Sequence, residues 1–223
     1  MPVPTTIGVQ MLENAATILS CTIKGEGKAN RRIPFALIRI QLLMTEFKQN
    51  EAKLAELILY ISQKCADDPC FGATKLNKIL YFADFLHYGN YGKPITGVEY
   101  QKLPYGPAPR RLVPVRKQLV DNGELGIQPV ELRSGGVQQK PVNLREPDLS
   151  IFSGTEIAQV DTVIQAFAGT NTDAISGLSH KMVGWQVVEE NATIPYPTVF
   201  VSNPKLTRLE IDRGLEVAAR LGL

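Results

Sequence analysis

The chain has 223 residues, of which 44% are hydrophobic and 21% are charged, as in an ordinary globular protein. Its net charge of +2 and isoelectric point of about 8.4 argue against a protein built around a polyanion, because dedicated nucleic-acid binders often exceed about 9. The best apolar run, residues 33–44, is too short to span a membrane and contains Arg39, so we expect a cytoplasmic protein with no membrane partner.

Residues 1–43 differ from the rest of the chain. They begin without periodicity and contain the glycine-rich, basic stretch IKGEGKANRR, which is typical of a loop. We interpret them as an N-terminal extension that is either disordered or precedes the natural start of the protein at Met44. The alternative is a genuine extra helix over 33–48 that packs on the domain. The domain itself is expected to span 44–223.

Two helices are predicted next. From Met44 the sequence has a helical pattern, with Leu54, Leu57, Ile58 and Ile61 on one face. A second helix is expected to begin at an N-cap, Thr74, and to end at Gly89, and its apolar residues cover most of its surface. A helix of this kind lies in the core, so its charged residues Lys75 and Asp84 need partners. They are nine positions apart, on opposite faces, and cannot pair with each other.

A segment rich in glycine and proline follows over 91–109. It is expected to form an ordered loop or short strand, with Tyr91, Tyr100 and Tyr105 buried. The next helix should begin at Pro109 or soon after and end at Gly123. Pro114 predicts that this helix is kinked or starts late, because an interior proline removes a backbone hydrogen bond.

The second half predicts a small ribbon and further helices. Ser134, Gly135 and Gly136 indicate the turn of a β-hairpin, and Pro129 and Pro141 suit only edge strands. A capping box, Ser153 and Glu156, opens the next helix. A shorter helix is expected over about 172–180, and a last helix over 205–223, interrupted or bent at Gly214. The fold class is therefore α+β, mainly α: a compact helical domain with a two-stranded β-ribbon, in an order similar to that of winged-helix modules.

Catalytic and metal-binding patterns are missing from the sequence. It has no P-loop, no GxSxG and no HExxH. Cys21, Cys65 and Cys70 lack the spacing of a zinc site and are interpreted as reduced thiols. We therefore expect neither an enzyme nor a cofactor. The histidine His180 and the single tryptophan, Trp185, are expected to lie together, either anchoring the C-terminal segment to the core or forming a partner-binding patch.

Several motifs in order resemble those of one family. They are KLNKILYFAD at 75–84, YGKPITGVEY at 91–100, YGPAPRRL at 105–112, GLSHKMVGW at 177–185 and IPYP at 194–197. The stretch from about 44 to 201 resembles the Panacea domain of SocA-like antitoxins, also found as phage-associated GepA-like proteins. Pro114 and the first 43 residues depart from that pattern.

The resemblance implies an antitoxin that neutralises a cognate protein toxin by direct binding, either masking it or holding it for a cellular protease. No catalysis is implied. The residues expected to form the motif core or the partner-binding site are Lys75, Tyr81, Asp84, Tyr100, Tyr105, Gly106, Pro107, His180 and Trp185. Tyr100, Tyr105, His180 or the toxin itself are the expected partners of Lys75 and Asp84.

Two alternatives stay open. The first is a winged-helix DNA-binding regulator that contacts operator DNA through a local cluster of basic residues, Arg110, Arg111, Arg116 and Lys117, with the two neighbouring arginines in the first turn of their helix. The second is a phage-associated interaction protein without a toxin.

Overall fold

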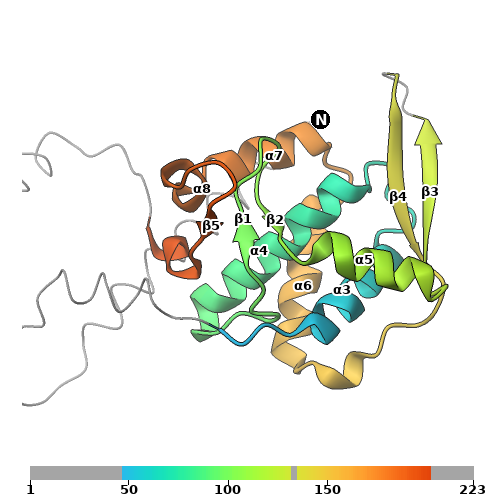
Figure 1. Cartoon of the computed structure of the whole chain (residues 1–223), viewed down its shortest axis with the longest axis horizontal. Coiled ribbons are helices and arrows are strands. Elements are labelled where there is room, and N and C mark those ends of the chain that lie inside the picture. Colours follow the sequence, from blue (N-terminus) through green and yellow to red (C-terminus); the bar gives the residue numbers. More distant parts are fainter. Residues whose placement is uncertain (1–46, 132–134, 202–223) are drawn as a thin grey trace, which may run out of the picture.

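Helix α4 forms the centre of the molecule, and the other elements are packed around it (Figure 1). The computed structural model describes residues 47–131 and 135–201. Helices α3 (Glu51–Lys64), α6 (Gly154–Phe167) and α7 (Thr172–His180) all contact α4 (Ala73–Tyr91). The expected class, α+β and mainly α, is confirmed. The boundary at residue 44 and the predicted helix at 205–223 lie outside the described residues.

The first two helices lie where their apolar pattern places them, but their ends differ from the sequence prediction. Residues 47–50 precede α3, and Asn50 caps it by accepting a hydrogen bond from the Lys53 amide. The expected α3 face, including Leu54 and Ile58, is fully buried.

Helix α4 is longer than predicted at both ends. Gly72, not Thr74, precedes its first turn, and the chain runs through Gly89 as helix. It stops at Gly92, whose φ of 73° places it in the left-handed conformation that ends many helices.

Two small sheets accompany the helices. Strand β1 (Tyr100–Gln101) pairs antiparallel with both β2 (Ala108–Pro109) and β5 (Thr193–Ile194). The β-ribbon consists of β3 (Leu125–Glu131) and β4 (Val137–Asn143), as the hairpin pattern predicted. In Figure 1 it lies at one side of the molecule, beyond α5 (Leu112–Asp121). Of the three tyrosines expected to be buried in the segment 91–109, Tyr100 is buried, whereas Tyr91 and Tyr105 are exposed.

Pro114 explains the start of α5. The helix begins at Leu112, later than Pro109, and the first backbone bond at its start runs from the Val115 amide to the Arg111 carbonyl. Pro114 therefore occupies the first turn, where amide groups have no acceptor within the helix. The late start is one of the two outcomes that the proline predicted, with Pro114 as the third residue of the helix, and it costs no hydrogen bond.

The remaining segments are short helical turns. Helix η1 (Leu149–Ile151) precedes α6, and the capping box of Ser153 and Glu156 at the start of α6 is present. Further along the chain lie helix α8 (Val183–Val187) and the short helix η2 (Tyr196–Phe200). No helix among residues 47–131 and 135–201 is long and apolar enough to cross a membrane.

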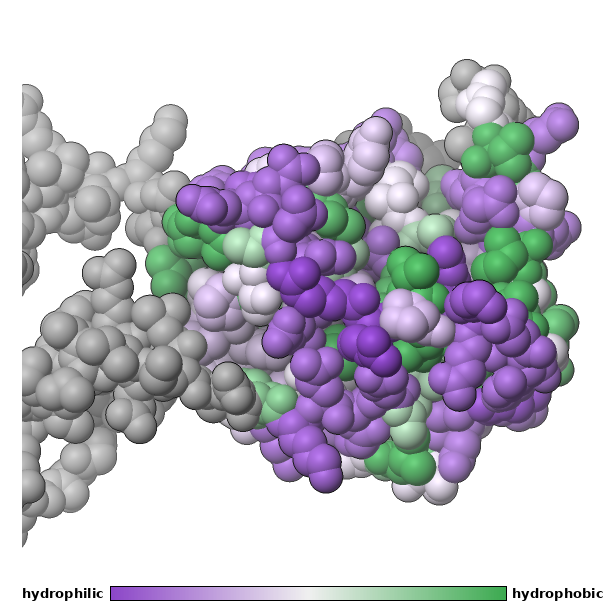
Figure 2. Space-filling view, viewed as in Figure 1, coloured by the Kyte–Doolittle hydropathy of each residue, from purple (hydrophilic) through white to green (hydrophobic). Residues whose placement is uncertain are grey.

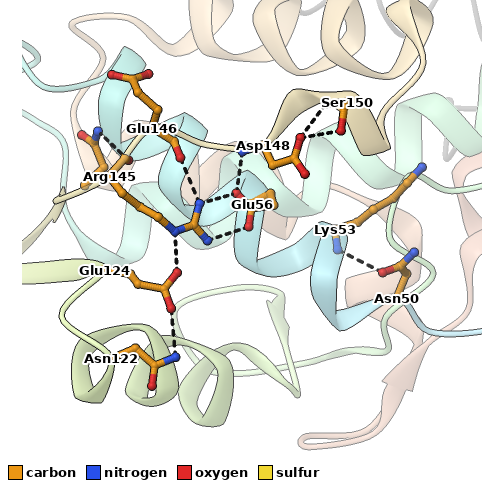
Figure 3. A network of polar contacts seen from close by, with 10 residues as sticks. Asn50, Lys53, Glu56, Asn122, Glu124, Arg145, Glu146, Asp148 and Ser150 are labelled. Atoms are coloured by element: carbon orange, nitrogen blue, oxygen red, sulfur yellow. Dashed lines mark hydrogen bonds and ion pairs between the residues drawn. The ribbon is translucent and has the colours of Figure 1, made fainter.

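Arg145 holds the end of the β-ribbon against the helices (Figure 3). Its two terminal nitrogens donate to the two carboxylate oxygens of Glu56 on α3, at 2.6 and 2.8 Å. Its Nε donates to Glu124, between α5 and β3, at 2.5 Å. Hydrogen bonds from the guanidinium hold the pKa of Glu56 below its usual value against the effect of burial. The two parallel hydrogen bonds from Arg145 to Glu56 fix both the distance and the orientation between the end of the β-ribbon and α3.

We expect Arg145→Ala to destabilise the protein by about 1–3 kcal/mol, because the partly buried Glu56 carboxylate loses its partner. Urea unfolding measures the change. Lys117→Ala is the control, since its pair with Asp121 is exposed and should contribute about 0.5 kcal/mol or less. Equal losses in the two variants would contradict a fixing role for Arg145.

Candidate protein-binding site

The sequence motifs meet around α4. Lys75, Tyr81 and Asp84 belong to α4, Tyr100 to β1, and Tyr105, Gly106 and Pro107 to the loop before β2. His180 ends α7 and Trp185 lies in α8. Most of these residues prove to support the fold, and only two of them reach the surface groove described below.

Asp84 is fully buried and joins α4 to the first small sheet. Its carboxylate accepts hydrogen bonds from the Thr96 amide at 2.8 Å, the Thr96 hydroxyl at 2.5 Å and the Tyr100 hydroxyl at 2.7 Å. Burial raises the pKa of Asp84, and these hydrogen bonds act against that rise. Tyr100 was among the partners expected for Asp84. The buried ring of Tyr81 completes this contact, with its centroid 5.6 Å from that of Tyr100.

Lys75 has a partner that the sequence analysis missed. Its Nζ donates to the Asp68 carboxylate at 2.5 Å and to the Thr170 carbonyl at 3.0 Å. Burial acts to raise the pKa of Asp68, but the hydrogen bond and charge of Lys75, together with hydrogen bonds from the Cys70 and Gly169 amides, leave that pKa below its usual value. The expected partners Tyr105 and His180 were wrong. The contact fixes the start of α4 to the loop before it and to the connection between α6 and α7.

A second buried lysine lies one helical turn further along α4. Lys78 is 1% exposed and donates to the Pro107 carbonyl at 3.2 Å, and burial lowers its pKa to about 8. Gly106 lies against the Lys78 side chain and has a left-handed backbone conformation, with φ of 99°. A Cβ atom at Gly106 would lie 2.7 Å from Lys78 Nζ and 2.5 Å from Ser179 Oγ. The YGP motif therefore needs its glycine for close approach.

His180 and Trp185 lie together, as expected, and anchor the C-terminal part. Their rings stack with centroids 4.1 Å apart, and the Trp185 indole donates to the Leu103 carbonyl at 3.2 Å. The Lys102 ammonium lies 4.5 Å from the indole centroid. Burial and the nearby cations Lys78 and Lys102 lower the pKa of His180. Its Nε2 atom is buried and has no hydrogen-bond partner among the described residues.

A groove of about 630 Å³ opens beside this scaffold. Its walls are the start of α4, one side of α7 and strand β4, and Tyr105 and His180 both line it. Tyr105 is 79% exposed, and Val137 on β4 is 58% exposed. Among the lining residues only Asp173 carries a charge at neutral pH, because the lowered pKa keeps His180 neutral. The groove thus offers apolar and uncharged polar surface.

The comparison with protein families agrees with these motifs. Residues 76–186 match the family described as antitoxin SocA-like, Panacea domain. This chain carries a Panacea domain. The match begins one residue after Lys75, includes the other eight candidate residues from Tyr81 to Trp185, and ends before the IPYP motif at 194–197. Neither a curated protein nor a solved structure matches the chain.

The basic cluster of the Panacea domain is largely neutralised by acids from other segments. Arg111 forms a two-point contact with Glu51, at 2.6 and 3.1 Å. Arg110 lies 3.3 Å from the Glu99 carboxylate and also binds the Asn191 carbonyl.

The remaining two basic residues lie on α5 itself. Lys117 pairs with Asp121, and Arg116 is partly buried. Arg110 and Arg111 were expected in the first turn of the helix, which was wrong: Arg111 is the N-cap and Arg110 precedes it.

The described part of the Panacea domain contains no group of three or more His, Cys, Asp or Glu side chains that could hold a metal ion. Cys65 and Cys70 are free thiols, and Cys21 lies outside the described residues. Burial raises the pKa of Cys65 to about 11, which makes it a poor nucleophile at neutral pH.

The lowered pKa of Lys78 gives a pH test. Between about pH 8 and its ordinary value of 10.5, the folded protein has lost the Lys78 proton while the unfolded chain keeps it. The unfolded state then binds more protons, so the stability due to this group rises with pH. Relative to Lys78→Met, the free energy of unfolding of the wild type should rise by about 1.5 kcal/mol between about pH 8 and pH 9.5. Denaturant unfolding at each pH measures this difference, and parallel pH profiles would contradict it.

Proposed function

We propose that this protein is the antitoxin of a toxin–antitoxin pair and neutralises its toxin by direct protein binding. The observation that carries the proposal is the Panacea domain at 76–186. Its motif residues make a rigid scaffold of buried hydrogen bonds beside a groove with little charge, which suits contact with another protein. No catalytic step is assigned to the chain, and its place of action is the cytoplasm.

The proposed mode of neutralisation is masking of the active surface of the toxin. Holding the toxin for a cellular protease is the alternative. In the proposal the functional unit extends over 44–223. Tyr105 and His180 contact the partner, while Lys75, Tyr81, Asp84, Tyr100, Gly106, Pro107 and Trp185 hold the binding surface in place.

The DNA-binding alternative has less support. Binding to phosphates needs basic side chains that are free to replace counterions. Arg110, Arg111 and Lys117 instead lie beside Glu99, Glu51 and Asp121. A phage-associated interaction protein without a toxin would use the same surface, and the test below separates it from an antitoxin.

Co-expression tests the proposal directly. A neighbouring reading frame whose product kills the host when expressed alone should be tolerated when this protein is present. Growth under separate induction of the two genes is the measurement.

The control is a variant with a disturbed core, Asp84→Ala, which leaves three buried donor groups without an acceptor. It should lose both stability and protection. Undiminished killing by every neighbouring product, with wild-type antitoxin folded and present, would contradict the proposal.

A further inference from the structure

In the part of the chain that the structure describes, no strand pairs with the edge of β4 that faces away from β3. Within residues 47–131 and 135–201 the β3–β4 ribbon consists of two strands, in the register Leu125↔Asn143 to Glu131↔Val137. The Leu144 amide donates to the Glu124 carbonyl, so Glu124 and Leu144 form a hydrogen-bonded pair just before the ladder. The adjacent pair, Leu125↔Asn143, is therefore not hydrogen-bonded. Because hydrogen-bonded and non-bonded pairs alternate, the amide and carbonyl groups of Val137 and Gln139 point away from β3.

The two prolines agree with this assignment. Pro129 and Pro141 fall at the non-bonded pairs Pro129↔Gln139 and Ile127↔Pro141, where a proline removes no hydrogen bond from the ladder. Pro141 also closes the free edge at one end, since it has no amide to donate. Val137 and Gln139 are therefore the two residues of β4 that line the groove with amides pointing outward from the ribbon.

The groove provides side-chain contacts for a peptide whose backbone would pair with the outward groups of β4. Val137 and Gln139 line it together with Ser176 and Gly177 of α7 and with the exposed ring of Tyr105. Gly177 is in mid-helix, and a Cβ atom there would meet nothing within 4 Å. The glycine costs helix stability of about 1 kcal/mol and keeps the groove open. The acidic Asp173, with no basic side chain beside it in the lining, disfavours an anionic occupant.

We propose that this groove binds an extended segment of the toxin, which adds a strand to β4 at Val137 and Gln139 and lays an apolar side chain against Tyr105. Strand addition at an open edge supplies backbone hydrogen bonds, and alternate side chains of the segment give specificity. The segment carries no acidic residue where it faces Asp173. That the partner is a toxin rests on the proposed function, whereas the site itself does not.

Two variants of the full chain test the site. Gly177→Arg fills the groove from a position with open space and favours the helix. Gln139→Pro removes one outward amide and leaves the ladder to β3 intact. Each variant has a matched control. Gly154→Arg also adds a side chain where there is open space, but at the first residue of α6, outside the groove lining. Glu131→Pro removes an outward amide from the other edge of the ribbon, on β3.

The probe is a library of random linear peptides displayed on phage and selected on the wild-type protein. Selected peptides should lack acidic residues and bind Gly177→Arg and Gln139→Pro at least about tenfold more weakly than both controls. Unfolding curves verify that all four variants fold. Equal binding to the variants and controls, or no enrichment at all, would overturn the site.

Sedimentation tests the other occupant, a second copy of this chain. A wild-type dimer that Gln139→Pro dissociates and Glu131→Pro does not would also overturn the proposal. In the co-expression assay, Gly177→Arg should fail to protect against a toxin that Gly154→Arg neutralises. Peptide binding at the groove without any neutralised toxin would refute the proposed function alone. Neutralisation that is unaffected by Gly177→Arg would refute the groove alone.

Discussion

A helix in the core of a protein must find partners inside the protein for its buried charged side chains. Helix α4 meets this constraint for Lys75, Lys78 and Asp84, all of which are at most 1% exposed. Leaving any of them unsatisfied would cost about 1–3 kcal/mol or more. The surrounding loops are therefore held where they can supply the acceptors and donors: Asp68 and Thr170 for Lys75, Pro107 for Lys78, and Thr96 with Tyr100 for Asp84.

The same contacts build the groove. Thr170 lies next to Asn171, the N-cap of α7, so its bond to Lys75 places the start of that helix. The bond from Lys78 to the Pro107 carbonyl places the loop that carries Tyr105. The β-ribbon forms the remaining wall, held by Arg145 and by the hydrogen bond from the Gln138 side chain to the Phe71 carbonyl. Hydrophobic residues on the visible face form separate patches among hydrophilic ones (Figure 2). A surface of this kind suits a partner that is recognised by backbone pairing and one or two apolar side chains.

The sequence predicts the elements of this fold better than their contacts. Apolar periodicity located α3 and α4, the Ser153–Glu156 box located α6, and Pro114 predicted the late start of α5. The ends of α4 were misplaced, because Gly72 and Gly92 act through backbone geometry and compete with plausible signals at Thr74 and Gly89. Asp68 could not be assigned to Lys75, nor Glu51 to Arg111, since these pairs depend on tertiary packing. The groove was missed because its most informative groups are outward backbone amides, which no side-chain pattern marks.

Amide hydrogen exchange on the complex with the cognate toxin tests the central claim most directly, which is that the scaffold presents one protein-binding groove. The account predicts that the amides of Val137 and Gln139 and those of α7 become protected on binding, while residues 110–117 exchange as in the free protein. Protection confined to 110–117, with the β4 edge unchanged, would contradict it and would place the partner on the basic side of α5.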